Sequence, residues 1–170
     1  MKPASLFFLA ASFLIFPGCA GYHTGVNKPK QMVNVTKLAV PTFKNETLQP
    51  RLEVLVTDAV IKHLQIQGTY KIVAVDEADA VLHGTIEDIT SRQFRAQRNN
   101  TIRTSQLLEG LIVKYEIKGG PNNEVLMKGQ TRADSTLILD PNFQVTKQQA
   151  LADAAVRLGE NLSIEVTEGW

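Results

Sequence analysis

Cys19 stands at the end of a short apolar N-terminal segment, and this placement determines which part of the chain is left to fold. Lys2 supplies a positive charge, and residues 6–16 are apolar apart from one serine. The run is too short to span a bilayer, which takes about 20 apolar residues, so it is typical of a signal peptide. Gly18 directly precedes Cys19, as cleavage of a bacterial lipoprotein requires. The sequence therefore predicts a signal peptide over residues 1–18 and a lipidated Cys19 as the mature N-terminus.

The predicted lipid on Cys19, a diacylglycerol and an N-acyl chain, is the only covalent group that we expect. The alternative is an ordinary secretory signal with an incidental cysteine. Cys19 is the only cysteine, so its acylation leaves no thiol for a disulfide, for catalysis or for a metal site. Ala20 follows, and no aspartate is present there to retain the protein at the inner membrane. We expect an outer-membrane lipoprotein that faces the periplasm.

Removing residues 1–18 from the 170-residue chain leaves 152 residues with 17 basic and 17 acidic side chains. A formally neutral chain gives no reason to expect a nucleic-acid partner or a bulk attraction to anionic membranes. Residues 19–34 are mostly polar and without periodicity, so we predict a flexible tether there. Residues 35–170 are predicted to form a single domain, which their number allows.

Hydrophobic periodicity predicts the elements of this domain. Strands are expected over residues 35–43, 70–75, 80–97, 111–117 and 124–139. One amphipathic helix follows Pro50 and ends at Gly68, a suitable C′ residue. A second helix is expected from Thr146, whose spacing to Gln149 is that of a capping box. The predicted order is β-α-β-β-β-β-α.

Each predicted helix carries one apolar stripe, and the strand around residues 111–117 has one apolar and one polar face. These faces are buried together in an α+β two-layer sandwich, with two helices packed on one face of a mainly antiparallel sheet. Because a helix lies between the first two predicted strands, that pair can be parallel or split.

The sequence contains no pattern typical of an enzyme or a metal site. The histidines, at positions 23, 63 and 83, have no partner at metal-ligand spacing. No nucleophile elbow, phosphate-binding glycine loop or dinucleotide fingerprint occurs. We therefore expect no catalysis, no metal and no cofactor beyond the lipid.

One charge cluster stands out in this neutral chain. Between Asp88 and Glu109 there is no acidic residue, and the basic residues of this stretch are all arginines: Arg92, Arg95, Arg98 and Arg103. The planar guanidinium matches phosphate oxygens in bidentate fashion. Two interpretations stay open at this point: a docking edge for a polyphosphorylated ligand, or a solvated hairpin tip between the third and fourth strands.

Several segments resemble the LptE family, the outer-membrane lipoproteins of lipopolysaccharide assembly. Residues 18–23 are similar to the family's Gly-Cys-Gly-Tyr-His start, with Ala20 as an extra residue. Residues 38–47 are similar to its first strand, and residues 50–60 to its first helix. Residues 78–86 also fit, but similar strands occur in other periplasmic lipoproteins, including the curli-secretion channel family.

The resemblance implies a non-enzymatic plug inside the LptD β-barrel, which supports barrel assembly and binds lipopolysaccharide on its way to the outer leaflet. On that basis Arg92, Arg95, Arg98 and Arg103 are expected to contact lipopolysaccharide. The alternative function is a lipoprotein that regulates or pilots another envelope machine, such as a secretion-pore subunit or an activator of a cell-wall enzyme.

Overall fold

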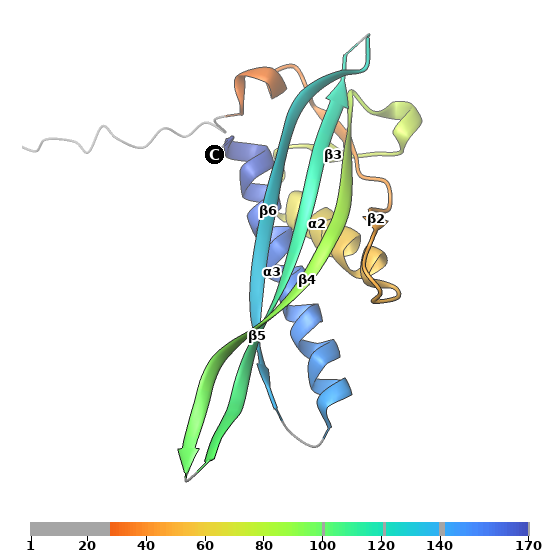
Figure 1. The fold of residues 1–170 in the computed structure, drawn as a ribbon. Coiled ribbons are helices and arrows are strands. Elements are labelled where there is room, and N and C mark those ends of the chain that lie inside the picture. Colours follow the sequence, from red (N-terminus) through yellow and green to blue (C-terminus); the bar gives the residue numbers. More distant parts are fainter. Residues whose placement is uncertain (1–27, 100, 121, 140–141, 170) are drawn as a thin grey trace, which may run out of the picture.

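The computed structural model describes residues 28–99, 101–120, 122–139 and 142–169, in which two long helices pack on one face of a six-stranded sheet (Figure 1). The elements are η2 (Lys30–Met32), β1 (Lys37–Ala39), β2 (Lys44–Asn45), α2 (Leu52–Gln67), β3 (Lys71–Ile72), η3 (Val75–Glu77), β4 (Ala80–Asn99), β5 (Thr101–Gly119), β6 (Glu124–Ile138) and α3 (Phe143–Glu168). The predicted α+β sandwich and its element order are confirmed, with the two-residue β2 as an addition.

The sheet has the strand order β3-β1-β4-β5-β6, and β2 also pairs with β4. β4, β5 and β6 are joined by antiparallel hairpins, which make up most of the sheet. β1 runs parallel to both β3 and β4, and β2 runs parallel to β4. These parallel pairs arise because α2 connects β2 to β3 as a crossover helix, which returns the chain to the same end of the sheet.

The core lies between the sheet and the helices. On β5 the odd-numbered residues from Leu111 to Ile117 are buried, as the sequence pattern predicts. The apolar stripes of α2 and α3 cover them, with Val60, Leu64 and Leu158 fully buried. α2 ends at Gly68, which has a left-handed φ of 66° and donates its N–H to Leu64 O at 3.1 Å. The predicted end of this helix is therefore confirmed.

The predicted start of the second helix is wrong by about one turn. α3 begins at Phe143, and the backbone N–H of Val145 already donates to Asn142 O at 3.0 Å. Thr146 thus lies within the first turn, where its hydroxyl donates back to Asn142 O at 3.2 Å. A threonine inside a helix commonly makes this bond to the carbonyl four residues earlier, so its spacing to Gln149 does not mark a cap here.

Residues 28–34, which the sequence assigns to a flexible tether, pack against the domain. Met32 is fully buried, and η2 lies beside β6. Lys28 Nζ donates to Val35 O at 2.7 Å and lies 4.8 Å from the centroid of the Tyr70 ring. Burial raises the pKa of Tyr70 to about 12, and its hydroxyl donates to Val166 O at 3.1 Å. The packed part of the chain therefore includes Lys28, while Cys19 and the rest of the predicted tether and signal peptide lie outside the described residues.

Gly84 on β4 leaves room for the ring of Phe43, which is 3% exposed. A Cβ atom at position 84 would overlap Phe43 Cδ2. We expect Gly84→Ala to lower the free energy of unfolding by about 1–3 kcal/mol, the usual cost of overpacking a core, as measured by urea denaturation. Combining it with Phe43→Leu should remove the clash, so that the two changes cost less together than the sum of their separate effects. Full stability of Gly84→Ala alone would contradict this packing.

Asp79 ties the start of β4 to the start of β1. Its Oδ2 accepts hydrogen bonds from the backbone N–H of Lys37 at 2.8 Å, from that of Thr36 at 2.9 Å and from Thr36 Oγ1 at 2.8 Å. These bonds, the one from Lys37 first, lower the pKa of Asp79 to about 2 from its usual 3.8. Because the folded pKa is depressed, the stabilisation is complete above the unfolded pKa and is lost as the pH falls through the folded one.

Asp79→Asn should accordingly lower the melting temperature at pH 7. The difference from the wild type should shrink between pH 3.8 and pH 2, where the wild-type carboxylate becomes protonated. Circular dichroism melts across this range measure it. Asp76→Asn, which changes an exposed carboxylate in the neighbouring η3, is the control and should leave the melting temperature nearly unchanged. A loss in Asp79→Asn that is the same at every pH would refute the ionic contribution.

Candidate ligand-binding arm and open sheet face

Beyond the end of β6, the strands β4 and β5 pair only with each other among the residues that the structure describes. The last pair between β5 and β6 joins Gln106 to Ile138, whereas β4 and β5 continue to the pair of Asn99 with Thr101. Figure 1 shows this two-stranded hairpin, drawn in green, projecting away from the sheet. We call residues 94–99 and 101–105 the arm. The predicted hairpin between the third and fourth strands is therefore confirmed, and it is longer than a turn.

Three of the four predicted site residues lie on the arm. Arg95 and Arg98 are on β4, and Arg103 is on β5. Gln97 pairs with Arg103 and Arg98 pairs with Ile102, so Arg98 and Arg103 occupy neighbouring positions on the two strands. The backbone register thus places these two arginines one pair apart on adjacent strands.

Arg92, the fourth, lies at the base of the arm on the open face, which is the face of the sheet that α2 and α3 do not cover. Its Nη2 is 3.1 Å from Asp134 Oδ2, and its side chain is 57% exposed. Arg132, which the sequence analysis missed, binds the same carboxylate: its Nη2 and Nε donate to Asp134 Oδ1 at 2.8 and 3.0 Å. Arg132 Nη2 also donates to Thr90 Oγ1 at 3.0 Å. Two guanidinium groups therefore share one carboxylate, and the cluster has a net positive charge.

Strand register explains why these residues meet. Gly110 on β5 lies between Thr90 on β4 and Asp134 on β6. A Cβ atom at Gly110 would lie 2.6 Å from Thr90 Oγ1 and 2.8 Å from Arg132 Nη2, so only glycine leaves room for the side chains that cross over it. Arg132 is far from Arg92 in the sequence. The turn after Gly119 was the available signal, because it sets the register of β6 against β5 and so determines which β6 residues lie level with a given β4 residue across β5.

On the opposite face of the sheet, next to the position of Gly110, lies a buried carboxylate. Glu109 is 1% exposed; its Oε1 accepts a hydrogen bond from Ser91 Oγ, and its Oε2 has no partner among the described residues. Neighbouring residues of a strand point to opposite faces, so Glu109 faces the helix layer while Asp134, paired with Gly110, faces solvent. The two carboxylates are separated by the sheet and do not form a general acid/base pair.

A shallow pocket of about 580 Å³ lies further from the arm on the open face, lined among others by His83, Lys114 and Lys128. Its charges are partly compensated. Lys114 Nζ lies 2.6 Å from Glu87 Oε1, and Gln130 Nε2 donates to Glu87 Oε2 at 3.0 Å. The open face as a whole therefore carries mixed charge, and the arginines gather at its arm end.

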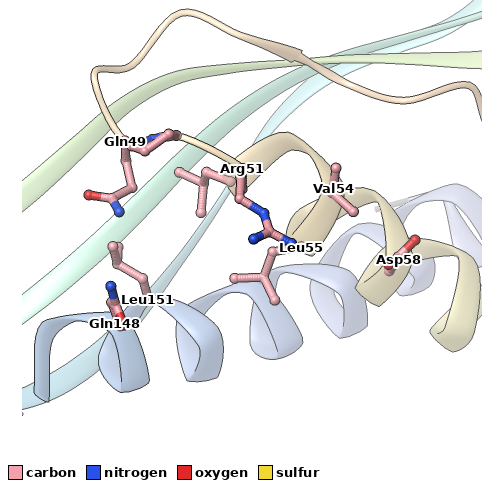
Figure 2. Close-up of a pocket in the computed structure, with 9 residues that line it drawn as sticks. Gln49, Arg51, Val54, Leu55, Asp58, Gln148 and Leu151 are labelled. Atoms are coloured by element: carbon pink, nitrogen blue, oxygen red, sulfur yellow. The ribbon is translucent and has the colours of Figure 1, made fainter. Parts of the chain in front are cut away.

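A second pocket, of about 380 Å³, lies between the start of α2 and the second and third turns of α3 (Figure 2). In the figure, Arg51 and Leu55 from the start of α2 lie opposite Gln148 and Leu151 on α3. Arg51 has a left-handed φ of 66° at the N-cap of α2. The lining mixes apolar side chains with polar and charged ones, and it contains no arrangement of a nucleophile with a base.

Neither a metal site nor a spanning helix is found in the described ranges. No group of three or more His, Cys, Asp or Glu side chains there is placed to hold a metal ion. Within the same ranges, no helix combines the length and the apolar composition needed to cross a bilayer. His63 lies half-buried on α2 and His83 is exposed on β4, whereas His23 falls outside the described residues.

The family model described as LptE, lipopolysaccharide-assembly, matches residues 35–163, which is nearly all of the folded domain. The chain belongs to the LptE family. It is thus a member of a family of outer-membrane lipoproteins that act in lipopolysaccharide assembly and envelope biogenesis, and the resemblance in the sequence is confirmed. Among curated protein sequences, none is detectably similar to this LptE-family chain.

Several solved structures share the fold. A minor lipoprotein from Acinetobacter baumannii is similar with a TM-score of 0.53 and 10% identity, over 79% of this chain and 94% of that one. A hypothetical protein from Chlamydia trachomatis has a TM-score of 0.55 and 9% identity, over 79% and 96%. A protein from Caulobacter crescentus described as a lipoprotein has a TM-score of 0.51 and 13% identity, over 74% and 88%. At these identities the likeness concerns the fold alone.

Proposed function

We propose that this LptE-family protein is a non-enzymatic outer-membrane lipoprotein that plugs an LptD-type β-barrel, helps to assemble it and binds lipopolysaccharide during transport to the outer leaflet. The family match over residues 35–163 carries the proposal. A formally neutral domain with a mixed-charge open face is compatible with the water-lined lumen of a large barrel. Lipid on Cys19 would hold the domain at the outer membrane, facing the periplasm. Two or more acyl chains make such an anchor stable, where one chain is marginal.

Lipopolysaccharide is proposed to bind through its phosphate groups at the arm. Arg95, Arg98 and Arg103 lie on the arm and Arg92 at its base, within a stretch that has no acidic residue between Asp88 and Glu109. Such clustering raises the local positive potential, and guanidinium groups bind phosphate oxygens in bidentate fashion. Because Arg92 is paired with Asp134, it should contribute less to the affinity for lipopolysaccharide than the three arm arginines do.

The complex with the barrel is the test of the proposed function. Purification of the tagged, full-length protein from native membranes, followed by mass spectrometry, should recover one outer-membrane β-barrel in a one-to-one complex. Depletion of the protein should lower the amount of correctly assembled barrel, measured by its heat-modifiable migration on gels. An unrelated outer-membrane lipoprotein with the same tag is the control. Recovery of only periplasmic enzymes, or of a homo-oligomeric ring, would instead support a regulator or pilot of another envelope machine.

A further inference from the structure

The open face at the base of the arm combines the arginine cluster with exposed apolar side chains. Ile138 at the end of β6 is 56% exposed, and Phe94 is 51% exposed at the bulge where β4 enters the arm. Leu108, half-buried on β5, lies between Arg92 on β4 and Thr136 on β6. We call Leu108, Ile138 and Phe94 the apolar strip. Adjoining exposed apolar side chains that are rimmed by polar groups are a candidate binding surface.

The cluster is built so that both guanidinium groups stay accessible. Asp134 holds Arg132 through two hydrogen bonds and Arg92 through one, and the Arg132 side chain is 36% exposed. A guanidinium has five N–H donors, so each arginine keeps donors for a ligand. With two positive charges and one negative charge, the pair retains an attraction for an anion, and its planar groups suit a phosphate.

The distance between the arginine pair and the apolar strip is one that a single amphiphilic molecule can span. Asp134 and Ile138 are on the same face of β6, four residues apart, which corresponds to about 13 Å along a strand. In a molecule that carries a phosphate and acyl chains on the same sugar, the chains start near the phosphate and extend away from it, so one molecule can contact both the arginine pair and the apolar strip. A free phosphate would leave the apolar strip uncovered, and an uncharged lipid would leave the arginine pair unused.

We propose that Arg92 and Arg132 bind a phosphate of a single phosphorylated, acylated glycolipid while the apolar strip contacts its acyl chains. The charge of the cluster favours a phosphate and the adjoining apolar side chains favour acyl chains, while the family match favours a glycolipid that carries both. The inference rests on the proposed function, since lipopolysaccharide is a glycolipid of this class, and it adds Arg132, Ile138, Leu108 and Phe94 to the contact surface. The arm arginines remain available for further phosphates of the same molecule.

The experiment uses the full-length lipidated protein in nanodiscs of neutral phosphatidylcholine, with protein-free nanodiscs as the blank, and three probes: lipopolysaccharide, its deacylated form and its dephosphorylated form. Arg132→Gln should lower the affinity for the two phosphorylated probes about tenfold, and leave the dephosphorylated probe unaffected. Arg132→Lys keeps the charge but loses the planar fork, so it should give a smaller loss. Ile138→Ser should weaken binding of the two acylated probes about fivefold, and leave the deacylated probe unaffected.

Two variants on the same strand are matched controls. Lys128→Gln removes an exposed positive charge from the open face of β6, and Val125→Ser removes an exposed apolar side chain near its other end. Neither should change the affinity for any probe, and circular dichroism checks that every variant is folded. If Arg132→Gln behaves as Lys128→Gln does, or Ile138→Ser as Val125→Ser does, the inference is overturned. If the wild type binds lipopolysaccharide but only changes in the arm weaken that binding, this inference fails and the proposed function stands. If the wild type does not bind lipopolysaccharide at all, both the inference and the proposed lipopolysaccharide binding fail.

Discussion

Cys19→Ser should weaken the attachment of the protein to the outer membrane, because it removes the predicted acyl chains that would anchor it there. We expect the wild type, extracted from membranes, to start at Cys19 and to have an intact mass above that of the 152-residue chain by a diacylglycerol and an N-acyl chain. The serine variant should carry no lipid, and the protein that is not bound to the proposed barrel should leave the outer-membrane fraction. Intact mass spectrometry and membrane fractionation measure the two effects.

Ala20→Asp is the matched control for this experiment. It leaves the cysteine in place, so the lipid should be attached, but it introduces the aspartate that retains lipoproteins at the inner membrane. The protein should then be found in the inner membrane instead of the outer membrane. Its mass should differ from that of the wild type only by the substitution, because the lipid is still attached. A mature wild-type chain that begins at another residue, or an unmodified Cys19, would exclude lipoprotein processing.

The elements that could be predicted from the sequence are those whose burial follows a local period. The alternation through Val113 and Tyr115 identifies a strand with one buried face, and the stripe that includes Val60 and Leu64 identifies α2. Two helices with one apolar stripe each leave few ways to bury a sheet, so the sandwich follows from the same patterns. Gly68 could be predicted as the helix end because its role depends on backbone conformation alone.

Features that depend on distant contacts could not be predicted in this way. Met32 lies in a polar segment with no period, and its burial beside β6 is decided by a strand nearly a hundred residues later. The start of α3 was misplaced because a capping pattern at Thr146 also occurs inside a helix. The candidate site likewise combines a part that the local sequence predicts with a part that depends on distant contacts. The arginine cluster is visible as a run without acidic residues, whereas Arg132 joins it only through the register of β6 against β5.

The three arm arginines, together with Arg92 at the base of the arm, provide the second large effect. Replacing Arg92, Arg95, Arg98 and Arg103 together with Gln should lower the affinity for lipopolysaccharide by about a hundredfold or more. Hydrogen bonds to charged groups contribute about 1.5–3 kcal/mol each when well formed, so losing several exceeds the 2.7 kcal/mol of a hundredfold change. The dephosphorylated lipid should bind wild type and variant nearly equally. Added salt should shrink the difference between the two proteins for the phosphorylated lipid, because it screens exposed charges.

Folding should survive these substitutions, since the arm pairs only with itself beyond the pair of Gln106 with Ile138. Circular dichroism checks this. A control variant that loses the same total charge from exposed positions elsewhere combines Lys30→Gln, Lys62→Gln, Lys71→Gln and Arg157→Gln. It should keep wild-type affinity, because the proposed binding depends on where the arginines lie and not on net charge. If wild type and the arginine variant bind both lipids equally, the arm is a solvated hairpin; if the control loses as much affinity as the arginine variant, the attraction is nonspecific.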